Sequence, residues 1–173
     1  LIPAVDSFFV LGEGALRSYR RWGLLGRREG KCIHFGVDAK FWCPAESEFL
    51  SAVDPFILSV GSDTGRDYET LLQSELPGRL VVVTRQDLPK VQGVEVLSEL
   101  ENHELRNLYR TSSFVIIPLK DVSQPSGQSA ALQAMACGKA VVMSHTRGLW
   151  DPGGLRHREN IWLVPPGNPA ALQ

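Results

Sequence analysis

Short runs of apolar and β-branched residues alternate with helix-like segments along most of this 173-residue chain. Runs with so few polar positions are typical of strands that are covered on both faces of a parallel sheet. The sequence predicts strands over 5–11, 31–35, 56–61, 79–84, 93–98, 113–118, 139–144 and 160–165. Helices are predicted over 15–23, 68–76, 99–111 and 126–138, with a helix start at 168–173. The expected fold is α/β, a doubly wound Rossmann-like parallel sheet with helices on both faces.

Composition excludes several other classes of protein. A hydrophobic fraction of 43% is enough for a packed core, and a net charge of −1 argues against a general nucleic-acid binder. The apolar runs, such as 114–119, are much shorter than the ~18–20 residues that a membrane-spanning helix needs. The cysteines lack CxxC spacing and the histidines lack metal-ligand spacing. We therefore expect a reducing cytoplasmic location and no bound metal.

The two ends of the chain suggest that it is a piece of a longer protein. The start, LIPAVDSFF, lacks both an initiating Met and the basic region of a signal peptide, and the last residues resemble an interrupted helix. Residues 45–54 separate the first strand–helix pair from the regular alternation that begins at Phe56, so they form a plausible domain boundary. A basic cluster surrounds the WGLLG turn at 22–26. It is interpreted as a solvated helix face, with a membrane-facing or acceptor-side patch as the alternative.

The segment GSDTGRD at 61–67 follows a predicted strand and opens a helix. Its small residues allow a ligand to approach the backbone, and helix amides attract anions. Arg66 could add a forked donor for a phosphate group. The segment matches neither of the common glycine-rich phosphate loops, so an ordinary turn with Arg66 and Asp67 in solvent is an equal alternative.

The segment from Pro118 to Gly138 is the most informative part of the sequence. A buried strand ends at Pro118, and SGQS (126–129) then opens a helix, with Ser126 as the expected N-cap and Gly138 as the C-terminal stop. Backbone amides at this helix start would point toward an anion beyond the sheet edge. Ser129 and Gln133 lie one turn apart on the same face. Alternatively, Gln133 is only a satisfied amide at the helix edge, and Ser126 only a cap.

Several stretches together resemble a known enzyme family. They are ALQAMACGKAVVMSHTRGLWD, ENIWLVPPGNPAALQ, HFGVDAKFWCP, FILSVGSDTGRDYETLLQS and LRNLYRTSSFVIIP. In this order they resemble the C-terminal, donor-binding half of retaining GT-B glycosyltransferases of the family 4-like, group 1 type. The resemblance implies a domain that binds a nucleotide-diphospho-sugar, transfer of the sugar with retained anomeric configuration, and no cofactor or tightly bound metal.

The resemblance also implies roles for individual residues. Gly61, Ser62 and Arg66 fall in the first turn, where the family holds the diphosphate, and Leu97 and Ser98 fall where the family's backbone touches the base. The remaining donor-binding positions lie at the start of the later helix: Ser126, Gly127, Gln128, Ser129 and, for the ribose, Gln133.

Three positions depart from the family's pattern. Ser62 replaces an Arg, Gln133 stands for the second acidic residue of the family motif, and Pro125 stands for the first. An amide can still hydrogen-bond ribose hydroxyls, but proline cannot replace a carboxylate. No catalytic residue is assigned.

The family pattern also divides the chain. Residues 1–44 resemble the tail of the N-terminal domain plus the interdomain crossover, and 45–173 resemble a nucleotide-sugar-binding domain truncated at its C-terminal end. The acceptor, a saccharide or a lipid-linked molecule, would bind the missing N-terminal domain. We therefore expect this chain alone to be inactive, and the full protein to be cytoplasmic or at the inner face of the membrane. The alternatives are a non-catalytic nucleotide-sugar-binding or assembly module, and a nucleotide-sugar epimerase of the same architecture.

Overall fold

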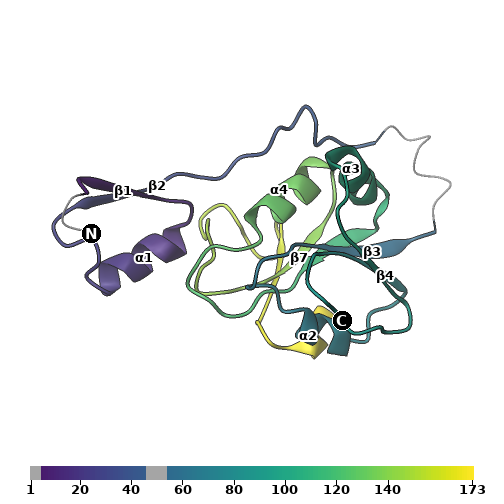
Figure 1. The fold of residues 1–173 in the computed structure, drawn as a ribbon. Coiled ribbons are helices and arrows are strands. Elements are labelled where there is room, and N and C mark those ends of the chain that lie inside the picture. The colour runs from purple at the N-terminus through teal and green to yellow at the C-terminus, as the bar shows by residue number, and fades with distance from the viewer. Residues whose placement is uncertain (1–4, 46–53) are drawn as a thin grey trace.

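The structure, a computed structural model, describes residues 5–45 and 54–173 and contains two parallel sheets (Figure 1). The smaller sheet pairs β1 (Ser7–Val10) with β2 (Glu29–Cys32), and α1 (Glu13–Arg21) connects them. The larger sheet contains β3 (Phe56–Val60), β4 (Arg79–Val83), β5 (Val94–Leu97), β6 (Phe114–Ile117), β7 (Val141–Ser144) and β8 (Trp162–Val164). Its helices are α2 (Tyr68–Gln73), α3 (Asn102–Thr111), α4 (Gln128–Ala136) and the 3₁₀ helix η3 (Pro169–Leu172).

The larger sheet has the strand order β5-β4-β3-β6-β7-β8, and all neighbouring pairs are parallel. From β3 the chain proceeds outward to β5, then returns to β6 on the other side of β3 and continues to β8. The direction of winding therefore reverses between β3 and β6, which makes this the switch point of a doubly wound sheet. The predicted fold class is confirmed.

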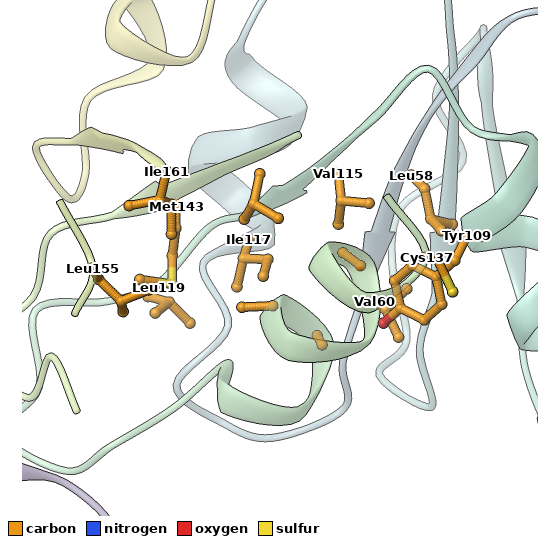
Figure 2. Close-up of a cluster of buried hydrophobic side chains, with 14 of the residues drawn as sticks. Leu58, Val60, Tyr109, Val115, Ile117, Leu119, Cys137, Met143, Leu155 and Ile161 are labelled. Atoms are coloured by element: carbon orange, nitrogen blue, oxygen red, sulfur yellow. The ribbon is translucent and has the colours of Figure 1, made fainter. Parts of the chain in front are cut away.

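Helices cover both faces of this sheet, as expected. On one face, α3 and α4 pack on a cluster that includes Leu58, Val115 and Ile117 (Figure 2). The α4 side of this contact is built from three buried alanines, whose small side chains let the helix lie close to β6. On the other face, α2 and η3 contribute Leu71 and Leu172 to a second cluster. Within the described residues, no helix is long and apolar enough to cross a membrane.

Several element boundaries differ from the predicted ranges by a few residues, and the reasons are identifiable at β2 and α2. The predicted strand at 31–35 begins earlier, at Glu29, because its register is set by backbone pairing with β1 rather than by apolar side chains. Helix α2 ends at Gln73, three residues before the predicted end, where Ser74 donates its hydroxyl to the carbonyl of Leu71.

The start of α4 also differs from the sequence prediction. The predicted N-cap, Ser126, is wrong: the N-cap is Gly127, which has φ 77° and no side-chain cap. A positive φ of this size favours glycine, so the helix starts at Gln128. The predicted stop is confirmed, because Gly138 follows the C-cap with φ 76°.

Of the predicted boundary segment 45–54, residues 46–53 lie outside the described residues.

The small β1–α1–β2 unit contacts the larger domain through its backbone (Figure 1). The amides of Glu13 and Gly14, at the start of α1, donate to the carbonyls of Trp150 and Leu149 at 2.9 and 3.3 Å. A Cβ atom at Gly14 would overlap the backbone of residues 147 and 148, so this approach requires glycine. The contact brings the end of β1 close to the start of α4.

Candidate functional site

The loops that follow β3 and β6 meet at the switch point of the larger sheet. Arg66 and Leu119 form an antiparallel bridge. On either side of it, the Asp67 amide donates to the Pro118 carbonyl at 3.1 Å, and the Lys120 amide donates to the Gly65 carbonyl at 2.9 Å. In open parallel sheets, ligands bind at this place, beyond the carboxyl ends of the strands. The sequence-predicted segments at 61–67 and 118–138 therefore lie side by side where a ligand is expected.

Arg66 is buried at the centre of this junction, with only 4% of its surface exposed. Its guanidinium lies between two glycines that come from different loops. A Cβ atom at Gly61 would overlap Arg66 Nε, and one at Gly127 would lie 3.0 Å from Arg66 Nη1. Both glycines are thus needed to admit the side chain. The alternative interpretation of Arg66 as a solvated turn residue is wrong.

The buried guanidinium has few partners. Neither Nε nor Nη1 of Arg66 makes a hydrogen bond to any part of the chain that the structure describes, although both atoms are buried. Among the residues that the structure describes, its one ion-pair partner is Asp63, whose Oδ2 lies 3.4 Å from Nε and whose side chain is 49% exposed. Burying a cation with unsatisfied N–H groups is unfavourable, and such groups gather at functional sites. Arg66 is therefore suited to an anionic ligand.

Asp63 and its neighbours brace the loop after β3. Asp63 Oδ1 accepts hydrogen bonds from the Gly65 amide at 3.0 Å and from Ser126 Oγ at 2.7 Å. The backbone carbonyl of Asp63 accepts from Gln86 Nε2 at 2.7 Å, and Ser62 Oγ accepts from the Arg85 amide at 2.9 Å. Ser126 thus connects the two loops instead of capping α4. Sequence reasoning missed Asp63, although it lies inside the predicted segment.

A hollow of about 250 Å³ lies beside this loop, at the carboxyl ends of β3 and β4. Its lining includes Gly61, Ser62 and the exposed Ser98, three of the residues predicted to contact the donor. Leu97 packs against the core, and its carbonyl accepts from the Thr84 amide at 2.9 Å. The lining also includes Glu99, which has a φ of 55° that is unusual for a non-glycine residue.

Gln133 is held by a buried tyrosine. The Tyr109 hydroxyl donates to Gln133 Oε1 at 3.2 Å, and Tyr109 itself is fully buried. Burial raises the pKa of Tyr109, so its hydroxyl remains a donor. Figure 2 shows the ring of Tyr109 beside Cys137, at the end of α4. Sequence analysis did not single out Tyr109; the available signal was the polar Gln133 inside the otherwise apolar run at 130–137.

Two other residues of the predicted set lie at the start of α4. Gln128 faces the small unit rather than the switch-point loops, and its side-chain amide donates to the Leu11 carbonyl. Ser129 is exposed on the first turn of α4, one turn before Gln133. Pro125, which precedes this helix, would lie 3.1 Å from a Cβ atom at Gly12. The structure thus gathers Gly61, Arg66, Ser126 and Gly127 and turns Gln128 away from them.

Two further hollows are larger, and only one of them lies apart from the switch-point loops. One of about 380 Å³ lies at the opposite edge of the sheet, near Trp162, and includes none of the predicted residues. Another, of about 400 Å³, lies on the α2 side and is lined by residues that include Arg66, Gln86 and Lys120. Among residues 5–45 and 54–173, no group of three or more His, Cys, Asp or Glu side chains is placed to hold a metal ion.

Solved structures with the same fold are glycosyltransferases of the GT-B type. Sucrose-phosphate synthase from Thermosynechococcus elongatus is 22% identical, with a TM-score of 0.80 over 99% of this chain and 48% of that protein. Anabaena Alr3699/HepE, solved in complex with UDP-glucose, is 17% identical, with a TM-score of 0.74 over 97% of this chain and 52% of that one. The chain therefore spans about half the length of these proteins.

A shorter structure matches as well. The C-terminal domain of the glycosyl transferase group 1 protein LpcC from Francisella tularensis is 17% identical, with a TM-score of 0.58 over 78% of this chain and 82% of that domain. No curated protein sequence matches the chain significantly. A family model described as glycosyl transferases group 1 matches residues 64–173, which is more than half of the chain and includes most of the switch-point residues. The resemblance in the sequence is thus confirmed, and the chain belongs to the glycosyl transferases group 1 family.

Proposed function

We propose that this chain is the donor-binding half of a retaining glycosyltransferase, which transfers a sugar from a nucleoside diphosphate sugar to an acceptor held by the other half of the enzyme. The observation that carries the proposal is the guanidinium of Arg66. It is buried, its Nε and Nη1 have no hydrogen-bond partner among the described residues, and it lies at the switch point where ligands of such sheets bind.

The diphosphate would bind between the two switch-point loops. Arg66 supplies a fixed positive charge there, and the first amides of α4 supply the positive end of a helix dipole. Gly61 and Gly127 have no side chains, so the guanidinium can lie directly against the backbone of both loops. These groups would also stabilise the negative charge that develops on the diphosphate as the bond to the sugar breaks.

The nucleoside would extend from the diphosphate toward β4 and β5. The hollow lined by Ser62 and Ser98 is suited to the base, which the backbone of Leu97 and Ser98 would contact. The ribose would contact Gln133, whose amide Tyr109 holds in place through Oε1. Because Gln133 is neutral, it hydrogen-bonds hydroxyls without the charge assistance of a carboxylate. Ser129 is exposed one turn earlier, on the same face of α4 as Gln133.

One observation favours a second function, a nucleotide-sugar-binding module without transferase activity. Pro125 stands where the family has its first acidic residue, and it packs near Gly12 of the small unit instead of presenting a carboxylate. A proline can neither accept a hydrogen bond through its side chain nor carry charge. The two functions share donor binding and differ only in turnover.

Donor binding is tested by calorimetric titration of the chain with UDP, GDP and ADP. We expect one of the three to bind in the micromolar to millimolar range, and absence of binding by all three at millimolar concentration would refute both functions. Turnover is tested separately, as sugar transfer by the full-length protein from the donor that carries the preferred nucleotide. Transfer would refute the non-catalytic module.

Arg66→Ala tests the assigned anion site. Removing a charge-assisted hydrogen bond to phosphate should weaken binding by about 1.5–3 kcal/mol, or roughly tenfold to a hundredfold. Arg79→Ala is the matched control. Arg79 lies at the amino end of β4, away from the carboxyl ends of the strands, and pairs with Glu95. Equal affinities in the two variants would remove Arg66 from the site.

A further inference from the structure

Asp63 places a negative charge inside the site that is proposed to bind the diphosphate. Its Oδ1 accepts from Ser126 Oγ at 2.7 Å, and its Oδ2 lies 3.4 Å from Arg66 Nε. A carboxylate therefore already contacts two of the groups that would otherwise be available to phosphate oxygens. Packing of the core does not require a carboxylate at this position, because the Asp63 side chain is 49% exposed.

We propose that Asp63 is a specificity-determining residue that competes with the diphosphate for Arg66 and Ser126 and thereby favours the sugar donor over the nucleoside diphosphate product. The inference rests on the proposed function, since it needs a diphosphate beside Arg66.

The preference follows from charge. In a nucleoside diphosphate sugar, the terminal phosphate is esterified and the diphosphate carries two negative charges. The product has a free terminal phosphate, which titrates near pH 6 and adds most of a third charge at neutral pH. A fixed carboxylate beside the terminal phosphate repels the product more strongly than the donor. Asp63 would thus lower the affinity for both ligands, and more for the product.

The position of Asp63 makes the effect moderate. A pair of charges near the protein surface interacts through a high effective dielectric, and salt screens it further. For one additional charge at the distance of a neighbouring phosphate, we expect a difference of about threefold to tenfold in the affinity ratio. The effect should shrink as ionic strength rises, because the carboxylate is half exposed.

Asp63→Asn separates the charge from the brace. An asparagine oxygen can still accept from the Gly65 amide and from Ser126 Oγ, so the loop keeps its hydrogen bonds while the negative charge is lost. Asp87→Asn is the matched control, because Asp87 is an exposed carboxylate in the loop after β4. Asp63→Ala removes both the charge and the brace, and shows the cost of losing the brace.

The experiment measures the dissociation constants of UDP and UDP-glucose for the wild-type chain and the three variants, at low and high salt. The expected result is tighter binding of both ligands by Asp63→Asn, with the larger gain for UDP, and no change for Asp87→Asn. Equal gains for the two ligands, or unchanged or weaker binding by Asp63→Asn, would overturn the inference and leave the proposed function standing. If no UDP, GDP or ADP binds to the wild type or to Asp63→Asn, the proposed function itself fails.

Discussion

Replacing Arg66 by methionine should make the protein more stable and at the same time abolish its anion site. Methionine keeps most of the length and the apolar part of the side chain, so packing between Gly61 and Gly127 is largely preserved. The substitution removes a buried guanidinium whose Nε and Nη1 have no hydrogen-bond partner within residues 5–45 and 54–173. The native residue is thus expected to lower stability in exchange for binding.

The magnitude follows from the contacts of the guanidinium. Each buried donor nitrogen without a partner costs about 1–3 kcal/mol, which gives about 2–6 kcal/mol for Nε and Nη1 together. The lost attraction to half-exposed Asp63 offsets less than about 1 kcal/mol of this. Replacing buried ionic groups by apolar ones of similar size commonly stabilises by about 1–4 kcal/mol, and we expect a value in that range. For a chain of 173 residues, each kcal/mol raises Tm by about 2–4 °C.

Urea unfolding at equilibrium and calorimetric melting without nucleotide measure this gain. Arg79→Met is the control, because Arg79 is half exposed and its replacement removes no buried, unpartnered group. Nucleotide should raise the Tm of the wild type and leave that of Arg66→Met nearly unchanged. A loss of stability of more than about 1 kcal/mol in Arg66→Met would show that the guanidinium is satisfied in the folded protein, and the reasoning would be refuted.

Two further substitutions test the supports of the site. Gly61→Ala should destabilise the protein more than Gly78→Ala in urea unfolding, by at least about 1 kcal/mol: both glycines have positive φ, but only at Gly61 would a Cβ atom meet Arg66. Equal losses would mean that the guanidinium moves aside freely. Tyr109→Phe should weaken calorimetric binding of the preferred nucleotide about twofold to fivefold, since Gln133 loses the hydroxyl that holds it. The 2′,3′-dideoxy nucleotide should be unaffected, and an equal change in both ligands would exclude contact of Gln133 with the ribose.

The larger sheet could be predicted because its strands are apolar on both faces and are bounded by helix signals or glycines. The run at 56–61 became β3, all of whose residues are buried, and the run at 113–118 became β6. The strands of the smaller sheet were harder to predict from the hydrophobic pattern. The strand β2 reads EGKC and carries almost no hydrophobic signal, since its position depends on backbone pairing with β1.

The site could be predicted in outline but not in its contacts. Arg66 and the SGQS segment are recognisable from the sequence, whereas the packing of the guanidinium against Gly61 and Gly127 depends on two loops that are distant in the chain. The direction of Gln128 was also beyond prediction. Its partner, the Leu11 carbonyl, lies 117 residues earlier in the chain, so the contact depends on how α4 packs beside the small unit.

The bridge between Arg66 and Leu119 has a consequence for the entropy of binding. Backbone hydrogen bonds on both sides of the bridge tie the loop after β3 to the end of β6, one of the central strands. The loop therefore loses little conformational freedom when a ligand arrives, and more of the interaction energy remains available as affinity. Hydrogen exchange at the Asp67 and Lys120 amides should accordingly be slow with or without nucleotide, as expected of a preorganised site rather than one that orders around its ligand.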